Sequence, residues 1–207
     1  MKVASVALDR AYEAAGAHLA RLWAKNRDVA GADHVRAILD AVDPQLADRL
    51  PAETRQALLD AYARPILLVP PAVDDGARPA LQRLRAEGRV LAVISNIMRT
   101  PGATLRTLLE RYGLLEYFAH LTFSDELGVR KPDPEIFVTT LRALGVEAEA
   151  TVHVGDDPVL DVHGAHGAGL RAIQVTSGAA SAAAARAPEA TISRLAALPD
   201  AIAALER

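Results

Sequence analysis

Three aspartates share one short glycine-rich stretch of the 207-residue chain, VGDDPVLDVHGAHGAGL. Asp156 and Asp157 follow an apolar run that ends in Gly155, and Asp161 comes one helical turn later. Carboxylate oxygens at the end of a strand suit Mg²⁺, which takes one or two protein carboxylates and keeps several waters. The competing interpretation is capping, because Asp157 before Pro158 is a good N-cap with proline in the first turn. Both hold together if Asp156 binds the metal and Asp157 starts the helix.

Two other segments carry groups that suit an anion. Ser95 and Asn96 follow the apolar run VLAVI, and a hydroxyl, an amide and backbone N–H groups at a strand end can hold a phosphate. Serine and asparagine are also common in caps and turns. Lys131 is held on a rigid loop by Pro132 and can face an anion, unless it is simply a solvated lysine. Asp161 could accept a hydrogen bond from Lys131 or from a metal-bound water.

The histidines near this stretch are weaker candidates for a functional site. His163 and His166 lie three residues apart, but no acid stands at metal-ligand spacing, so a surface or packing role is expected. His153 alternates within a strand, and we expect it to be buried and hydrogen-bonded. Asp74 and Asp75 are expected to cap a helix.

The first 70 residues have a helical pattern. Apolar positions at Leu8, Tyr12, Ala15, Leu19 and Leu22 recur every three or four residues, which predicts one face of an amphipathic helix. Further helices are predicted over Asp33–Val42, with Asp33 as N-cap, and over Pro51–Ala63. Pro70-Pro71 then stiffens a crossing to a second body.

After this crossing, strands alternate with helices, which indicates an α/β fold with a doubly wound, Rossmann-like parallel sheet. In such a sheet, ligands bind beyond the carboxyl ends of the strands. SGAASAAAARAPEA, Ser177 to Ala190, is expected to be a loop with a helical turn. The predicted strands are Val90–Ser95, Leu121–Phe123, Thr151–Gly155, Leu170–Val175 and Ala190–Ile192. The predicted helices are Asp74–Glu87, Thr104–Arg111, Pro134–Leu144, Pro158–Ala168 and Leu195–Glu206.

Composition excludes several classes of function. Cysteine is absent, so disulfides, thiolate metal sites and thiol catalysis are excluded. The formal charge of −3 gives no electrostatic case for nucleic acid or an anionic membrane. No apolar run reaches the roughly 18–20 residues that span a bilayer. The N-terminus carries Lys2 but no long apolar segment, so a cytoplasmic protein is expected.

Taken in order, these segments resemble the haloacid dehalogenase (HAD) superfamily of hydrolases, from about Val73 to the C-terminus. The resemblance rests on VISN, FSDELGVRKPDPEIF and VGDDPVLDVHGAHGAGL, and the last of these is closest to the phosphatase branch. It implies a helical cap domain over residues 1–70 and an α/β core over residues 71–207. It also implies that Ser95 and Asn96 bind phosphoryl oxygens, that Lys131 neutralises charge, and that Asp156 ligates Mg²⁺ with Asp157 and Asp161 in support.

The chain departs from the family at its first motif. The family begins with a strand ending in Asp-x-Asp-Gly-Thr, whose first aspartate is the nucleophile, and no such stretch occurs here. The one N-terminal candidate is Asp9 in ASVALDRAYE, which lies inside the helical period. Two explanations stay open: a chain that starts within the cap, and a degenerate first motif at Asp9. The core would lack its first strand, which would expose unpaired backbone and favour self-association into a homo-oligomer.

Three functions follow from the resemblance. The first is a phosphohydrolase that acts on a small phosphorylated metabolite through an aspartyl-phosphate with Mg²⁺, although this chain alone is expected to have little or no activity. The second is a non-catalytic protein that binds a phosphate ligand or a partner chain. The third is a haloacid dehalogenase or phosphonate hydrolase, for which Lys25 is the one cap lysine besides Lys2.

Overall fold

The computed structural model describes residues 4–176 and 186–207, which form two compact units. The first unit contains Met1–Pro71, Asn96–Leu108 and Phe123–Arg130, and the second contains the remaining segments. The sequence-based division into a cap of residues 1–70 and a core of residues 71–207 stays a prediction. Lys2 and most of the expected loop from Ser177 to Ala190 lie outside the described residues.

The first unit is helical. The helices α1 and α2 make its most extensive contact, and α1 buries Ala11, Ala15 and Leu19. Leu8 is exposed, so the predicted buried face of this helix is wrong at its first turn. The helices of this unit are α1 (Ser5–Trp23), α2 (Gly31–Val42), α3 (Leu46–Arg49), α4 (Ala52–Ala63), α5 (Pro65–Leu68), α8 (Ser124–Leu127) and most of α7 (Gly102–Arg111).

Two predicted caps are corrected by the structure. The N-cap of α2 is Ala30 rather than Asp33, which lies in the first turn with its N–H bonded to the Ala30 carbonyl. An acid in the first turn still stabilises the helix, because it lies near the positive end of the helix dipole. Asp74 belongs to the turn before α6 (Ala77–Ala86), where its Oδ1 accepts the N–H of Gly76, so this helix begins later than predicted.

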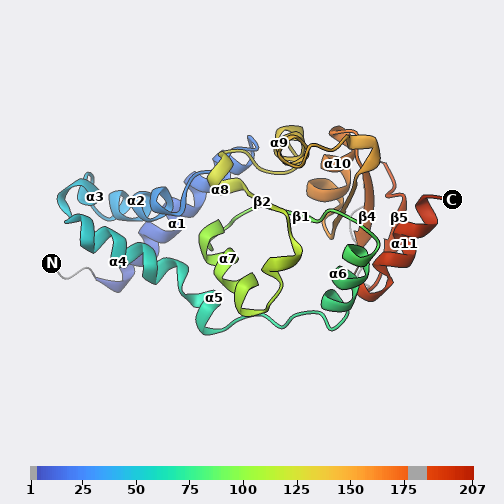
Figure 1. The fold of residues 1–207 in the computed structure, drawn as a ribbon. Coiled ribbons are helices and arrows are strands. Elements are labelled where there is room, and N and C mark those ends of the chain that lie inside the picture. The colour runs from blue at the N-terminus through green and yellow to red at the C-terminus, as the bar shows by residue number, and fades with distance from the viewer. Residues whose placement is uncertain (1–3, 177–185) are drawn as a thin grey trace. The chain divides into compact units, whose positions relative to one another are not determined.

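The second unit contains the strands and the helices that cover them (Figure 1). Its predicted helix over Pro158–Ala168 is divided into a π-helical segment, η3 (Pro158–His163), and α10 (Gly164–Gly167). The strands are β1 (Ala92–Ser95), β2 (His120–Phe123), whose last residue groups with the first unit, β3 (Val152–Gly155), β4 (Arg171–Val175) and β5 (Ala190–Ile192). Besides α6, its helices are α9 (Pro134–Leu144) and α11 (Leu198–Leu205), with short 3-10 turns η1 (Leu115–Tyr117), η2 (Ala148–Ala150) and η4 (Leu195–Ala197).

The described strands pair in two groups. β3, β4 and β5 form a parallel sheet in that order, with Val154 opposite Ile173 and Gln174 opposite Thr191. β1 pairs with β2 in a separate two-stranded sheet. Parallel strands joined by helices confirm the α/β, Rossmann-like fold class.

Helices pack on both faces of the three-stranded sheet. On one face, Leu84 of α6 and Leu198 of α11 form a buried cluster with Ile173. On the other face, the ring of His153 lies edge-on to Phe137 of α9, with centroids 5.0 Å apart. Because successive side chains of a strand point to opposite faces, β3 contributes to both layers.

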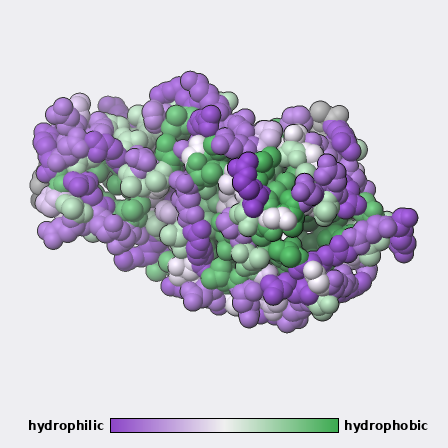
Figure 2. Space-filling model, turned by 45° about the horizontal axis from the view of Figure 1, so that its top comes forward, coloured by the Kyte–Doolittle hydropathy of each residue, from purple (hydrophilic) through white to green (hydrophobic). Residues whose placement is uncertain are grey.

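In the face shown in Figure 2, hydrophilic residues predominate and hydrophobic residues form smaller patches between them. Among the helices of residues 4–176 and 186–207, none is long and apolar enough to cross a membrane.

Candidate functional site

The candidate site is built around Gly155, at the carboxyl end of β3. A Cβ at this position would lie 2.2 Å from Cγ of Asp161, so only glycine fits. Asp157 caps η3, because its Oδ1 accepts the N–H groups of Val159 and Leu160 at 2.8 Å each. The predicted helix start at Asp157 is therefore confirmed.

Asp161 is the buried hub of the site, with 4% of its surface exposed. Its Oδ1 accepts from Lys131 Nζ at 2.5 Å and lies 2.9 Å from His153 Nε2. Its Oδ2 accepts the N–H of Asp157 at 3.0 Å. The Lys131–Asp161 hydrogen bond that the sequence allowed is present. His153 is hydrogen-bonded as expected, and its side chain is 10% exposed.

The ionisation states of this hub follow from its surroundings. Burial raises the pKa of the Asp161 carboxyl, but the hydrogen bond from His153 and the charge of Lys131 outweigh burial and hold this pKa well below its usual range. Burial is also the largest influence on His153 and lowers the pKa of its imidazole. The hub is therefore an ionised carboxylate that faces one ammonium and one neutral imidazole.

Lys131 links the hub to β1. Its Nζ also donates to the carbonyl of Ile94 at 3.2 Å, next to Ser95 at the end of that strand. Its loop is fixed on the other side, because a Cβ on Gly164 would lie 3.0 Å from Cα of Pro132. The ammonium is thus held between the Ile94 carbonyl of β1 and the Asp161 carboxylate of η3 rather than solvated.

Ser95 and Asn96 occupy the carboxyl end of β1, as predicted. Ser95 ends the strand in the second unit, and Asn96 is grouped with the first unit. Both side chains are half-buried. The backbone N–H of the next residue, Ile97, donates to Ser124 Oγ at 2.7 Å, which fixes the course of the chain beyond the strand.

Asp156 is the carboxylate that best fits a metal. It is exposed directly after β3, and its backbone carbonyl accepts from Gln174 Nε2 at 3.2 Å, which the sequence did not indicate. Oδ1 of Asp157 and both carboxylate oxygens of Asp161 accept from backbone or side-chain donors instead. No group of three or more acids and histidines arranged for a metal occurs within residues 4–176 and 186–207. One exposed carboxylate with waters fits Mg²⁺, while a dense protein cage is not formed.

Asp9 lies elsewhere. It belongs to α1 of the first unit and is exposed, with helical neighbours on both sides. His163 is exposed on η3, and His166 lies 3.0 Å from Glu189 Oε2, so these two histidines do not form a metal pair.

A buried polar network in the first unit was not foreseen. The Asp28 carboxylate accepts from Trp23 Nε1 at 3.0 Å and from Ser124 Oγ at 2.5 Å. Arg130 lies 3.5 Å from Asp28 Oδ2, and its N–H donates to the carbonyl of Asn26. An aspartate in a loop of this kind carries no sequence signal for burial. The network fixes the backbone immediately before Lys131.

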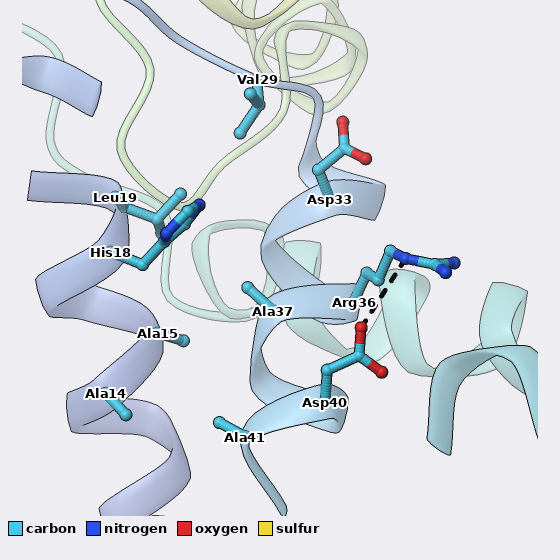
Figure 3. Close-up of a pocket in the computed structure, with 10 residues that line it drawn as sticks. All are labelled: Ala14, Ala15, His18, Leu19, Val29, Asp33, Arg36, Ala37, Asp40 and Ala41. Atoms are coloured by element: carbon cyan, nitrogen blue, oxygen red, sulfur yellow. Dashed lines mark ion pairs between the residues drawn. The ribbon is translucent and has the colours of Figure 1, made fainter. Parts of the chain in front are cut away.

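The first unit also contains two cavities of interest. The larger, of about 510 Å³, lies between α1 and α2 and is floored by alanines such as Ala15 and Ala37 (Figure 3). Its Arg36 is paired with Asp40 and with Asp48. The smaller, of about 150 Å³, is lined by two tyrosines, Trp23, Met98 and Arg99.

Comparisons with known proteins point to one family. A family model described as haloacid dehalogenase-like hydrolase matches residues 5–169. The chain is 35% identical over 102 residues to glyceraldehyde 3-phosphate phosphatase of Methanopyrus kandleri, covering 48% of this chain and 42% of the relative. It is 39% identical over 102 residues to phosphoserine phosphatase of Thermus thermophilus, covering 49% of this chain and 40% of the relative. The chain thus matches less than half the length of these relatives.

A solved structure agrees with this family. The 2-haloacid dehalogenase from Pseudomonas syringae superposes with a TM-score of 0.62 and 29% identity, over 97% of this chain and 93% of that one.

Proposed function

This chain belongs to the haloacid dehalogenase-like hydrolase family, and we propose that its site binds the phosphate group of a small phosphorylated metabolite beside Mg²⁺. The observation that supports this proposal is the position of Lys131. Its Nζ donates to the carbonyl of Ile94 at 3.2 Å and to Oδ1 of Asp161 at 2.5 Å. An ammonium fixed by these two acceptors is preorganised to stabilise an anion.

Each residue of the site then has a distinct part. Ser95 and Asn96 offer a hydroxyl, an amide and strand-end N–H groups to phosphoryl oxygens. Lys131 supplies a point charge, and Asp161 keeps that charge in place. His153 fixes the other side of Asp161 and stays neutral, which adds no charge to the site.

Asp156 is the residue that would hold Mg²⁺, with Asp157 contributing to the water shell. When bound, the ion would offset negative charge on the phosphate oxygens. Gln174 supports this role because it holds the carbonyl of Asp156 and so fixes the backbone from which the carboxylate projects.

The relatives support phosphate over halide. The two sequence relatives are named as phosphatases of small phosphorylated compounds, although this chain matches 42% and 40% of their lengths. A hydrolase that works through an aspartyl-phosphate also needs an attacking carboxylate at the phosphorus. Asp9, exposed on α1, does not have the strand-end setting of such a nucleophile. Phosphate binding without turnover by this chain is therefore the second candidate function.

Calorimetric titration of the 207-residue chain with inorganic phosphate in the presence of MgCl₂ tests the proposal. We expect saturable binding that Lys131→Met weakens by tenfold or more, since a charge-assisted hydrogen bond contributes about 1.5–3 kcal/mol. Lys25→Met, at an exposed position of the first unit, is the matched control and should bind phosphate like the parent chain. Equal binding by all three proteins, or none by the parent, would refute the phosphate site. Chloride release from 2-chloropropionate would favour the dehalogenase alternative.

A further inference from the structure

The segment that follows β1 is tied to α8 at both of its ends. It begins with Asn96 and Ile97 and runs to Gly102, the first residue of α7. The N–H of Ile97 donates to Ser124 Oγ at 2.7 Å, and the N–H of Gly102 donates to Asp125 Oδ2 at 3.1 Å. All of these residues belong to the first unit. The backbone next to Asn96 is therefore held by side chains of α8.

The hydroxyl of Ser124 has a single proton, and Asp28 determines where that proton points. Ser124 Oγ donates to Asp28 Oδ2 at 2.5 Å. An ionised carboxylate only accepts hydrogen bonds, so the hydroxyl cannot be the acceptor in this pair. The lone pairs of Ser124 Oγ are then left to accept the N–H of Ile97.

Asp28 is itself fixed on several sides. Its Oδ1 accepts from Trp23 Nε1 and from the N–H of Val29, at 3.0 Å each, and its own N–H donates to the carbonyl of Gly128 at 3.0 Å. Arg130 lies 3.5 Å from Oδ2, and its guanidinium carbon is 4.5 Å from the Trp23 ring centroid. A buried polar network with this many partners is rigid, so it gives Ser124 a fixed direction.

Burial restricts what these two side chains can do. Ser124 has no exposed surface and Asp28 has 4%. Neither side chain can therefore touch a ligand, and any effect on binding must pass through the backbone that they hold. Asn96 is the half-buried residue directly before Ile97, and groups that bind an anion need to be held within about 0.5 Å of their productive positions.

We infer that Ser124, oriented by Asp28, is a positioning residue for Asn96, whose amide binds a phosphoryl oxygen. Ser124 holds the chain beyond β1 in the conformation that presents this amide. The inference rests on the proposed phosphate site and goes beyond it by naming what keeps Asn96 in place.

A double-mutant cycle tests this role by calorimetric titration with inorganic phosphate and MgCl₂. Ser124→Ala removes the acceptor of the Ile97 N–H, and Asn96→Ala removes the amide. Each should weaken phosphate binding by about fivefold, the equivalent of one neutral hydrogen bond. In the Asn96→Ala background, Ser124→Ala should have no further effect, because nothing is left to position.

The control removes a different buried hydroxyl. Thr140 is 3% exposed, and its Oγ1 lies 2.7 Å from Thr122 Oγ1 and donates to the carbonyl of Ile136 at 2.8 Å. Thr140→Val should lower stability, as Ser124→Ala does, but should bind phosphate like the parent chain. This contrast separates positioning from a general loss of stability.

Amide hydrogen exchange gives a readout that does not depend on phosphate. The N–H of Ile97 should exchange faster in Ser124→Ala than in the parent chain, and at the parent rate in Thr140→Val. Asp28→Asn should also speed this exchange and weaken phosphate binding, because its amide can donate to Ser124 Oγ and compete with Ile97. Should Ser124→Ala fail to fold, Asp28→Asn decides in its place.

The outcomes separate the two proposals. If the parent chain binds phosphate but Ser124→Ala binds it equally well, or loses the same factor with and without Asn96, the positioning role is overturned while the phosphate site stands. Unchanged exchange at Ile97 also overturns it. If the parent chain does not bind phosphate, the phosphate site fails, and the positioning role fails with it.

Discussion

The ammonium of Lys131 lies 2.5 Å from Oδ1 of Asp161, and both side chains are largely buried, with exposed fractions of 11% and 5%. The pair joins the loop before α9 to the η3 segment after β3. A buried pair of this kind orients charge at the site, although its formation also requires desolvation of both ions.

Asp161→Asn should destabilise the chain by about 3–5 kcal/mol, because it leaves Lys131 as an uncompensated buried charge. Urea unfolding at neutral pH measures the change in the free energy of unfolding. Asp200→Asn is the matched control, since its side chain is 75% exposed, and it should shift stability by no more than about 0.5 kcal/mol. Equal effects of the two substitutions would show that the buried pair contributes nothing beyond a surface charge.

Stability should fall in two steps as the solution is acidified. Both His153 and Asp161 have pKa values lowered by folding, so each contributes stability above its unfolded pKa and loses it as the pH falls. The first step should begin below about pH 6.5 and the second below about pH 3.9. His34, whose pKa burial also lowers, contributes to the first step.

Two variants assign these steps. His153→Gln should reduce the first step without abolishing it, because His34 remains. Asp161→Asn should lose stability less steeply than the parent chain below about pH 3.9, so the difference between the two proteins should shrink there. A difference that grows on acidification would contradict the ionised state of Asp161.

The glycine before the aspartates has a steric role that Gly155→Ala tests. The added Cβ would meet Cγ of Asp161 at 2.2 Å, so the substitution should destabilise by about 2 kcal/mol or more and should displace the partner of Lys131. Gly16→Ala on α1 is the control, because nothing lies within 4 Å of its Cβ, and it should stabilise by about 0.5–1 kcal/mol. Thermal unfolding of both variants checks this contrast.

Local sequence signals predicted the helices and strands more accurately than they predicted the contacts within the site. The bounds of α9 match the prediction because Asp133 caps it, Pro134 occupies its first turn and Gly145 adopts a left-handed φ of 66° at its end. The strand ends that carry Ser95 and Asp156 were also found, since apolar runs followed by polar residues mark them.

Other features could not be read from spacing. The contact of Gly155 with Asp161 depends on a π-helical turn, and no local pattern distinguished η3 from an ordinary helix. The Asp28 network joins residues that are 96 positions apart, so it arises from tertiary packing alone.

Substitution of the two adjacent aspartates one at a time should show that Asp156 is a metal ligand and Asp157 a helix cap. Asp156→Ala should weaken Mg²⁺ binding by about tenfold or more and leave stability within about 0.5 kcal/mol of the parent, because the side chain is exposed. Asp157→Ala should cost about 1 kcal/mol, since it removes the acceptor for two N–H groups of η3. Calorimetric titration with MgCl₂ and urea unfolding of each variant give the two readouts. If Asp157→Ala weakened Mg²⁺ binding and Asp156→Ala lowered stability instead, the two roles would be exchanged.

Asp9 is the remaining candidate nucleophile within the chain, and hydrolysis of p-nitrophenyl phosphate tests it. We expect the 207-residue chain to show little or no Mg²⁺-dependent turnover, because Asp9 is exposed on α1 rather than placed at a strand end. Attack on phosphorus requires a carboxylate aligned with it, and charge stabilisation by Lys131 does not substitute for that group. Asp9→Asn should therefore leave the measured rate at the parent value, as should the neighbouring control Glu13→Gln on the same helix. Turnover that disappears in Asp9→Asn and persists in Glu13→Gln would make Asp9 the nucleophile and this chain an active hydrolase.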